Sequence, residues 1–317
     1  MRVTVTGATG LVGRALLARL RSEGAHVTAL SRDPARALEA LGVPADGDAY
    51  VQVHRWDPLR EPAPPAGLEE VDAVVNLAGE PLAQRWTAHT RQAIRESRVL
   101  TTRHLLDGLR EAGWSQERPP AFVSASAIGW YGPHGEEPLD EEAPAGRGFL
   151  AEVCVAWEAE ARRAQEEWGL RSVQVRTGVV LDRHGGALAQ MLPPFRLGLG
   201  GPVAGGRQYV SWIHLDDLLG ILHAACARQQ WSGPVNATAP EPVTNRELAH
   251  ALGRALHRPA VLPLPGAALR LRYGGMAQLI TTGARVLPAR PLMWGYDFRY
   301  PHLDDALRAA LTPPPAA

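Results

Sequence analysis

The sequence contains no lysine, because all 33 of its basic residues are arginine. This absence excludes a Schiff-base lysine, a phosphate-binding lysine of the Walker type and a lysine general base. Cysteine is nearly absent too, since Cys154 and Cys226 are the only two and lie far apart. They cannot form a disulfide framework or a paired-cysteine zinc site, so we expect a protein of a reducing compartment without a metal centre.

An excess of charge and a long apolar run are also missing. The 33 acidic residues balance the 33 basic ones, which argues against nucleic acid or an anionic membrane as the main partner. No apolar run approaches membrane-spanning length, and we expect no signal peptide before the first strand. We therefore expect a cytoplasmic protein whose 317 residues form one large domain with an added lobe, or two modest domains.

The most informative feature that is present is a glycine-rich turn near the start of the chain. Residues 3–6 alternate as in a strand, three glycines follow, and residues 11–20 carry apolar side chains at helical spacing. Such glycines let a pyrophosphate approach the free N–H groups of the helix start. A plain turn without a ligand is the alternative, but a strand before and a helix after favour a dinucleotide site. The residues expected to contact the cofactor here are Gly7, Thr9, Gly10, Leu11, Val12 and Gly13.

Strands and helices alternate along the first two-thirds of the chain. This order predicts an α/β fold, a Rossmann-like doubly wound parallel sheet covered by helices on both faces. The expected strands lie at residues 25–30, 51–57, 72–79, 121–126 and 173–176, and the long helices at 87–112 and 150–168.

The composition changes after about residue 181, where glycine and proline loops dominate. We predict an NADP-binding Rossmann domain at residues 1–185, with a strand returning to it near 233–239. A smaller C-terminal substrate lobe at 186–311 includes a helix after Asp216 and a second one opened by the capping box Thr244–Glu247. Residues 312–317 are expected to form a disordered tail.

The end of the second strand bears on the choice of cofactor. An acidic residue there accepts from the ribose 2′-hydroxyl of NAD, whereas arginine accommodates the 2′-phosphate of NADP. This sequence has Ser31 and Arg32, followed by Asp33. A solvated arginine at the start of a loop is the alternative, and Asp33 weakens the argument. The position after the strand nevertheless favours NADP(H).

Several motifs resemble those of the extended short-chain dehydrogenase/reductases. They are the glycine loop, Asp57 after the third strand, Asn76–Gly79 after the fourth, and Ser124–Ser126 with Tyr131 after the fifth. Residues 76–81, 149–158, 194–201 and 211–214 resemble more specifically the atypical, epimerase-related family, sometimes labelled nucleoside-diphosphate-sugar epimerase or cell-division inhibitor. A C-terminal domain of unknown function in that family is similar to residues 240–311.

The resemblance implies an NADP site and a homodimer. Ser31 and Arg32 would hold the 2′-phosphate, and the helices at 87–112 and 150–168 would form the dimer contact. For Arg98 the alternative is a solvated stripe with its neighbours Arg91 and Arg95. The further cofactor residues that the resemblance implies are Asp57, Leu77, Ala78, Arg98 and Val180.

The sequence departs from the larger superfamily at its catalytic residues. Ordinary members use Tyr-x-x-x-Lys, but those positions fall on Leu150 and Cys154, and the default interpretation of Cys154 is a buried, inert thiol. Ser126 matches the substrate-facing serine and could still donate a hydrogen bond. Tyr131 is the best replacement acid, with an aromatic plug beside the cofactor as the alternative. We predict Ser126 and Tyr131 as the catalytic residues.

Two functions are compatible with these residues. The first is an NADP(H)-dependent oxidoreductase that acts on an unidentified small substrate between the lobes. The second is a non-catalytic NADP(H)-binding sensor or scaffold, which the loss of Tyr and Lys favours. A polar and aromatic cleft favours the enzyme, and its predicted substrate contacts are Glu80, Arg207, Trp212 and His214.

Overall fold

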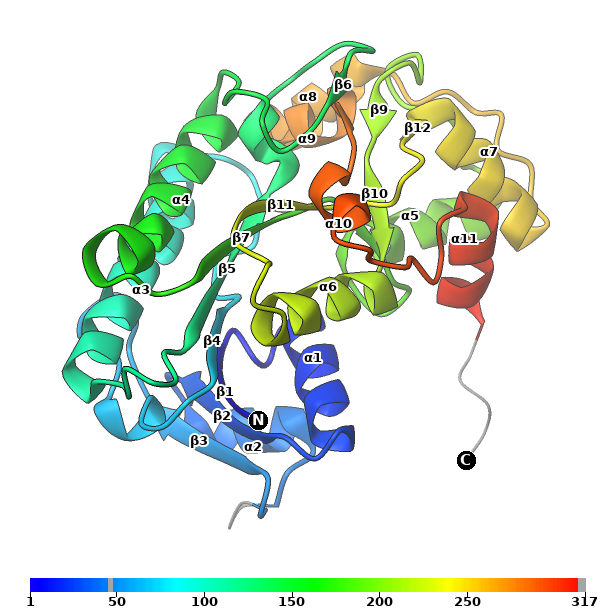
Figure 1. Ribbon diagram of the computed structural model, residues 1–317. Helices are drawn as coiled ribbons and strands as arrows, with labels where there is room; N and C mark the ends of the chain where they lie inside the picture. Colours follow the sequence, from blue (N-terminus) through cyan, green and yellow to red (C-terminus); the bar gives the residue numbers. More distant parts are fainter. Residues whose placement is uncertain (45–47, 313–317) are drawn as a thin grey trace.

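A computed structural model describes residues 1–44 and 48–312 of the chain. Its centre is a seven-stranded parallel sheet with the order β11-β7-β5-β4-β1-β2-β3 (Figure 1). This confirms the predicted Rossmann-like α/β fold. Of the predicted disordered tail, residues 313–317 lie outside the described residues. The strands of the sheet are β1 (Arg2–Thr6), β2 (His26–Ser31), β3 (Val51–Arg55), β4 (Ala73–Asn76), β5 (Ala121–Ala127), β7 (Ser172–Thr177) and β11 (Gly233–Ala237).

The strand order reverses at β1. This strand pairs with β2 on one side and with β4 on the other, Thr6 lying opposite Leu30 and opposite Asn76. Connections therefore leave the two halves of the sheet in opposite directions, and a crevice opens at the carboxyl ends of β1 and β4. Ligands of open parallel sheets bind at this point.

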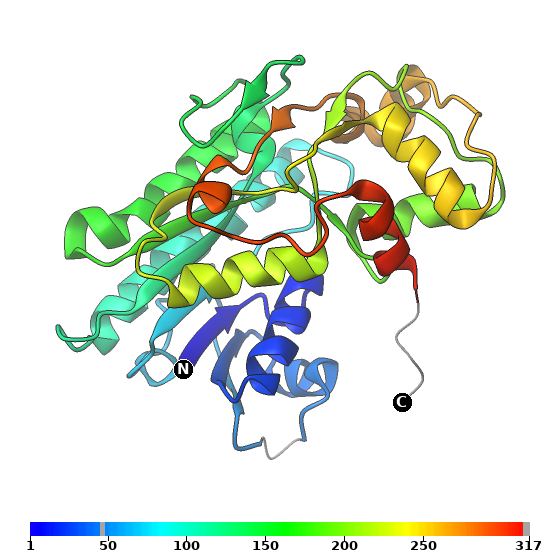
Figure 2. The same ribbon diagram turned by 45° about the vertical axis from the view of Figure 1, so that its right-hand side comes forward.

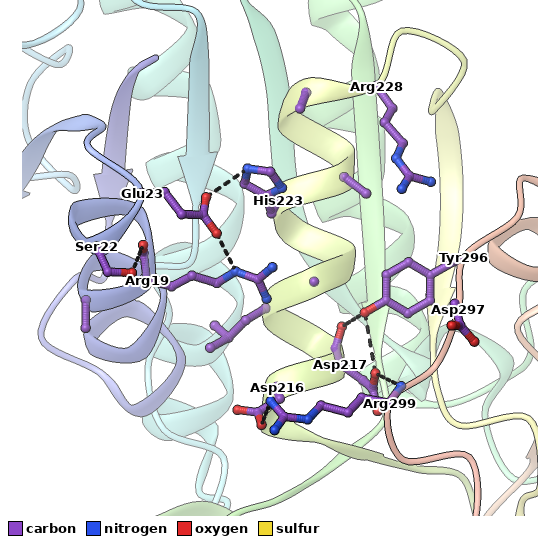
Figure 3. Close-up of a pocket in the computed structure, with 15 residues that line it drawn as sticks. Arg19, Ser22, Glu23, Asp216, Asp217, His223, Arg228, Tyr296, Asp297 and Arg299 are labelled. Atoms are coloured by element: carbon purple, nitrogen blue, oxygen red, sulfur yellow. Dashed lines mark hydrogen bonds and ion pairs between the residues drawn. The ribbon is translucent and has the colours of Figure 1, made fainter.

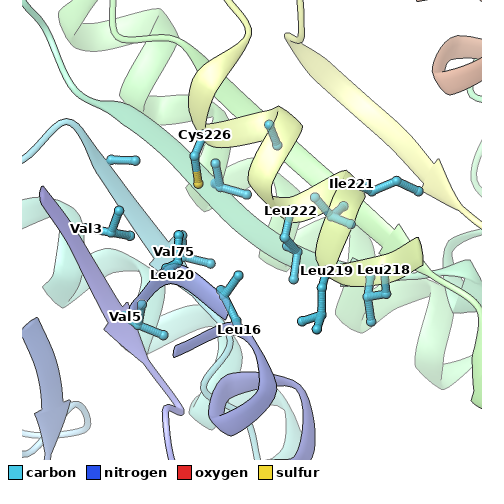
Figure 4. Close-up of a cluster of buried hydrophobic side chains, with 14 of the residues drawn as sticks. Val3, Val5, Leu16, Leu20, Val75, Leu218, Leu219, Ile221, Leu222 and Cys226 are labelled. Atoms are coloured by element: carbon cyan, nitrogen blue, oxygen red, sulfur yellow. The ribbon is translucent and has the colours of Figure 1, made fainter. Parts of the chain in front are cut away.

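Helices cover both faces of the sheet (Figures 1 and 2). On one face, α1 (Leu11–Ser22) and α6 (Leu215–Ala227) pack against Val3, Val5 and Val75 (Figure 4). On the other, α3 (Ala88–Ala112) and α4 (Phe149–Trp168) pack against Val74 and Phe122. Strands buried on both faces account for the continuous apolar runs in the sequence.

Helix α6 corrects one detail of the sequence interpretation. It falls within residues 186–311, which were expected to form the smaller lobe, but its Leu218, Ile221 and Leu222 belong to the core of the sheet. The following strand β11 returns to the sheet beside β7, as predicted. The chain therefore enters the smaller lobe, comes back for α6 and β11, and leaves again.

One helix was not predicted from the sequence. Helix α2 (Pro34–Leu41) occupies a stretch that the sequence interpretation treated as a loop. Asp33 caps it by accepting a hydrogen bond from the Arg36 N–H, and Pro34 stands in the first turn, where a missing N–H costs nothing. The signal was thus present in the Asp-Pro pair.

The smaller lobe is built on its own apolar core, which includes Leu188, Leu192, Trp212 and Leu252. The Thr244–Glu247 capping box opens α7, as predicted. No helix in the described ranges is long and apolar enough to cross a membrane.

The remaining helices are α5 (Gly186–Arg196), α7 (Asn245–Leu256), α8 (Gly266–Tyr273), α9 (Gln278–Thr281), α10 (Ala289–Met293) and α11 (Leu303–Leu311). The short strands are β6 (Pro138–Leu139), β8 (Val179–Leu181), β9 (Tyr209–Val210), β10 (Trp212–His214), β12 (Val243–Thr244) and β13 (Arg285–Val286); single turns of 3-10 helix are η1 (Pro65–Gly67), η2 (Ile128–Tyr131) and η3 (Gly274–Ala277).

Candidate functional site

The glycine loop lies at the switch point of the sheet and requires its glycines. Gly7 has a φ of 66°, and a Cβ there would lie 2.8 Å from the carbonyl carbon of Leu77. A Cβ on Gly13 would overlap the carbonyl oxygen of Gly7. Only glycine allows this close approach of β1, β4 and α1, which is the geometry of a dinucleotide loop.

The first turn of α1 is left open toward the crevice. Gly10 at its N-cap offers no side-chain acceptor, and the first turn contains no acidic residue. The backbone N–H groups and the positive end of the helix dipole are therefore available to an anion. Leu11 contacts the loop that follows β8, because a Cβ on Gly185 would lie 3.2 Å from its side chain. This places the β8 region, which contains Val180, beside the cofactor crevice.

A buried hydrogen-bond network fixes the floor of the crevice. The Thr6 hydroxyl accepts from the N–H groups of Leu77 and Ala78, both at 3.2 Å, and donates to Asn76 Oδ1 at 2.7 Å. Asn76 Nδ2 in turn donates to Thr102 Oγ1 on α3 at 2.8 Å. Leu77 and Ala78, both implied cofactor residues, are thereby held beside the glycine loop.

Two carboxylates that follow β2 and β3, those of Asp33 and Asp57, have partners other than Arg32. The Asp33 Oδ1 accepts from the Arg36 N–H at 3.1 Å, and the Asp33 N–H donates to the Ser31 hydroxyl at 3.2 Å. Asp57 pairs with Arg60 at 3.4 Å. Arg32 itself is exposed at the carboxyl end of β2. The position of Asp33 is thus explained by helix capping rather than by recognition of a ribose hydroxyl.

Arg98 lies at the crevice and differs from its exposed neighbours Arg91 and Arg95. It is half-buried, and its Nη1 donates to the carbonyl oxygens of Glu80 at 3.1 Å and Ile94 at 3.0 Å. Its guanidinium carbon is 5.3 Å from the centre of the Trp157 ring, and burial lowers the pKa of the group. A desolvated guanidinium without a carboxylate partner among the described residues is suited to an anionic or hydroxyl-rich ligand.

The two positions of the missing catalytic pair face the end of β5. A Cβ on Gly129 would lie 3.3 Å from the Cβ of Leu150 and 3.6 Å from the Sγ of Cys154. Cys154 is buried and donates to the Ala127 carbonyl at 3.7 Å, and burial raises its pKa to about 12. A thiol that stays protonated at neutral pH cannot replace the lysine cation.

Ser126 belongs to a buried ion-pair network. Its hydroxyl donates to Glu158 Oε1 at 2.6 Å, and Arg176 donates to both oxygens of that carboxylate, from Nε at 2.8 Å and Nη2 at 2.9 Å. All three side chains are buried. Because its one proton is given to Glu158, Ser126 presents only lone pairs to a ligand. The expected donation from Ser126 to a substrate oxygen is thus reversed in this arrangement.

Tyr131 lies at the other end of the same network and is 1% exposed. Its hydroxyl accepts from Arg176 Nη1 at 3.0 Å and lies 2.7 Å from Asn236 Oδ1 and 2.9 Å from the Asp140 carbonyl oxygen. Burial raises the pKa of Tyr131 to about 12. This geometry favours a structural role, and the assignment of a proton donor to Tyr131 stays a prediction.

The sequence interpretation did not recognise the Glu158–Arg176 pair. A signal existed, because Leu150, Cys154 and Glu158 are spaced by four along α4 and so share one face of it. An acidic residue on the buried stripe of a helix requires a cationic partner. Arg176, an arginine in an otherwise apolar strand, is the matching signal.

The four predicted substrate contacts differ in their placement. Trp212 is fully buried and its indole N–H donates to the Glu241 carbonyl oxygen at 3.0 Å, which corrects the expectation of a ligand contact. His214 is buried too, and its Nδ1 caps α6 by accepting from the Asp216 N–H at 3.1 Å, so it also has a structural task. Burial lowers the pKa of His214. Arg207 is exposed, and Glu80 remains half-buried beside Arg98.

A cavity of about 820 Å³ lies away from the glycine loop, between the last turns of α1, helix α6 and residues 296–299 (Figure 3). Several of its ionisable groups pair with one another: Glu23 with Arg19 and His223, and Asp216 with Arg299. Nothing predicted from the sequence falls here.

The parallel sheet, its glycine loop and the open start of α1 define a dinucleotide-binding protein of the Rossmann type. The chain belongs to the NAD dependent epimerase/dehydratase family, which matches residues 3–237. Residues 264–310 match a domain of unknown function, DUF1731. This confirms the resemblance stated above for both parts of the chain.

Similar proteins span the whole chain. The epimerase family protein SDR39U1 homolog of Arabidopsis thaliana is 38% identical over 98% of this chain and 87% of its own length. Human SDR39U1, crystallised with NADPH, superposes with a TM-score of 0.85 at 36% identity, covering 98% of this chain and 99% of that one. A UDP-glucose 4-epimerase of Thermus thermophilus with NAD, 22% identical with a TM-score of 0.74 over 98% of each chain, shares the fold.

Proposed function

We propose that this protein binds NADP(H) in the crevice above β1 and β4 and acts as an oxidoreductase on a small molecule. One observation carries the choice of NADP(H): Arg32 stands exposed at the end of β2 while the adjacent Asp33 is occupied as the cap of α2. The NADPH in the crystal structure of human SDR39U1 supports it. The fit is also supported by Gly7 and Gly13, which allow the close backbone approach of β1, β4 and α1 that a dinucleotide loop needs.

Each part of the crevice has a task in this proposal. The first turn of α1 binds the pyrophosphate, Arg32 binds the 2′-phosphate, and Arg98 donates toward the nicotinamide half. The nicotinamide supplies or accepts a hydride when it is bound. Ser126, which can only accept, orients a hydroxyl group of the substrate and holds it beside α4.

Cofactor titration tests the proposal. The expected result is a preference for NADPH over NADH of about tenfold to a hundredfold, from one charge-assisted contact of roughly 1.5–3 kcal/mol. Arg32→Ala removes that preference by weakening NADPH binding alone. Arg118→Ala is the matched control. It removes the same charge beside Asp72, at the amino ends of the strands and so away from Arg32. Equal affinity for both cofactors in the unmodified protein would refute the proposal.

A non-catalytic NADP(H) sensor is the second candidate, and the observation that favours it is the closed network around Ser126. The two functions are separated by following NADPH consumption with a panel of carbonyl compounds and NADP⁺ reduction with the matching alcohols. An enzyme shows turnover that Ser126→Ala lowers, because the substrate hydroxyl loses the acceptor that orients it. A sensor binds NADPH and shows no turnover with any compound.

We also propose that the protein is not a nucleotide-sugar 4-epimerase. That reaction needs a proton relay to the sugar 4-oxygen, and the two positions that would supply it hold Leu150 and Cys154. Incubation with UDP-glucose and NADP⁺ or NAD⁺ should leave the sugar unchanged. Formation of UDP-galactose would overturn this part of the proposal.

A further inference from the structure

A second arginine lies next to the expected 2′-phosphate position. Strands β2 and β3 run parallel, and in their register Ser31 stands directly opposite Arg55. Residues in register on neighbouring parallel strands project to the same face of the sheet, about 5 Å apart. Arg55 is exposed at the carboxyl end of β3. The Arg55 side chain therefore lies on the same face of the sheet as Ser31, at the carboxyl end of the strands where Arg32 follows directly.

A third arginine stands in the first turn of α2, at Arg36. A cation at this end of a helix opposes the helix dipole. The first turn contains no acidic residue to offset it, and Asp33 outside the turn is used as the cap. An anion bound at the start of α2 would remove this unfavourable electrostatic arrangement.

Among the described residues these arginines have no carboxylate partner. Within residues 1–44 and 48–312, no salt bridge involves Arg32, Arg36 or Arg55, whereas Arg60, which also follows β3, pairs with Asp57. Three guanidinium groups and the Asp33 carboxylate leave a local net charge of +2. A phosphate monoester carries about −1.5 to −2 at neutral pH and so balances this charge.

We propose that Arg55 is a second ligand of the NADP(H) 2′-phosphate, binding it from the β3 side while Arg32 binds it from the β2 side. Arg36 contributes at longer range through its charge. This inference rests on the proposed binding of NADP(H) and adds the residues that determine its specificity. The chemistry recognised is the dianionic phosphate on the adenosine ribose, which NADH lacks.

The experiment measures the dissociation constants of NADPH and NADH for the full chain and for Arg55→Ala, Arg55→Lys, Arg36→Ala and the control Arg118→Ala. Arg55→Ala should weaken NADPH binding by about tenfold and leave NADH binding unchanged. The NADPH affinity of Arg55→Lys should lie between those of Arg55→Ala and the unmodified protein, because lysine keeps the charge but lacks the planar guanidinium. Arg36→Ala should show about a threefold effect at low salt that shrinks at high salt. Thermal unfolding of each variant monitors the fold.

The possible outcomes separate this inference from the proposed function. If Arg55→Ala binds NADPH as the unmodified protein does, while Arg32→Ala loses its preference, Arg55 is not a ligand. The inference is also overturned if Arg55→Ala weakens NADPH and NADH equally, because such a change does not concern the 2′-phosphate. If the unmodified protein binds neither cofactor, it is the proposed function that fails.

Discussion

The two walls of the crevice differ in how their polar groups are used. On the cofactor side, the first turn of α1 is uncapped and Arg32 is exposed without an ion pair among the described residues. On the α4 side, Ser126, Glu158 and Arg176 are buried and satisfy one another. Unsatisfied groups that converge on a crevice are available to a ligand, whereas a closed network stabilises the fold.

This difference indicates which part of the superfamily's machinery the chain retains. The glycine loop and the uncapped start of α1, which suit a dinucleotide, are in place. The positions that normally move a proton hold Leu150 and Cys154, and the next turn of the same helix holds Glu158 instead. Binding is therefore the better supported half of the function, and the chemistry depends on groups outside the Tyr–Lys pattern.

The largest expected effect comes from breaking the closed network. Glu158→Ala leaves Arg176 as an unpaired buried cation, and loss of one partner of a buried ion pair costs about 3–5 kcal/mol of unfolding free energy. Urea denaturation measures it. Glu166→Ala on the same helix removes an exposed carboxylate that pairs with Arg162, and it should cost less than about 1 kcal/mol. Equal losses in the two variants would show that the network is not structurally important.

The next largest effect is expected at the glycine loop, on the cofactor side of the crevice. Gly13→Ala places a Cβ against the Gly7 carbonyl oxygen, so the loop must shift, at a cost of about 1–3 kcal/mol. NADPH binding should be lost together with the loop geometry. Gly135→Ala is the control, because its φ is ordinary and nothing lies within 4 Å of the added Cβ. A Gly13→Ala protein with unchanged NADPH affinity would contradict the assigned position of the pyrophosphate.

The sequence was sufficient for the fold and for most of the cofactor wall, for a physical reason. Parallel strands are continuous apolar runs, and the glycines of the loop are required by backbone contacts that are local in sequence, or made to the adjacent strand β4. Helix α2 was missed because Asp33 was considered only for its effect on the choice of cofactor and not as a helix cap.

The α4 wall was harder to predict because it depends on contacts between distant residues. Tyr131 reaches Asn236, which is 105 positions away, and Ser126 reaches Glu158, which is 32 away. Trp212 was predicted to contact substrate from its polar neighbourhood in the sequence, but its side chain faces the core of the smaller lobe. Burial of this kind is set by packing between segments, which no local pattern reveals.

A smaller effect is expected at Tyr131. Tyr131→Phe removes one of the two acceptors of Arg176 Nη1 and the hydroxyl that donates to Asn236 Oδ1, at a cost of about 1–2 kcal/mol, while NADPH affinity stays unchanged. Denaturation and cofactor titration of the same samples measure the two quantities. If Tyr131 is instead a proton donor to substrate, stability will change little and turnover will fall. That result would show that Tyr131 takes part in the reaction and is not only a member of the buried network.

The smallest effect concerns the pH dependence of His214. Burial lowers the pKa of its imidazole in the folded protein, although Asp216, Asp217 and Asp182 oppose the shift and Arg299 adds to it. The folded protein thus binds fewer protons than the unfolded chain, so this contribution to stability is complete above the unfolded pKa of about 6.5 and decreases as the pH falls through it. His214→Asn keeps an N-cap acceptor but does not titrate. The unfolding free energies of the two proteins, compared at pH 8, 7, 6 and 5, should therefore converge or cross toward low pH, because only the unmodified protein loses this contribution. A difference that stays constant over this range would show that the imidazole is not desolvated by the fold, and it would return His214 to the candidates that face a substrate.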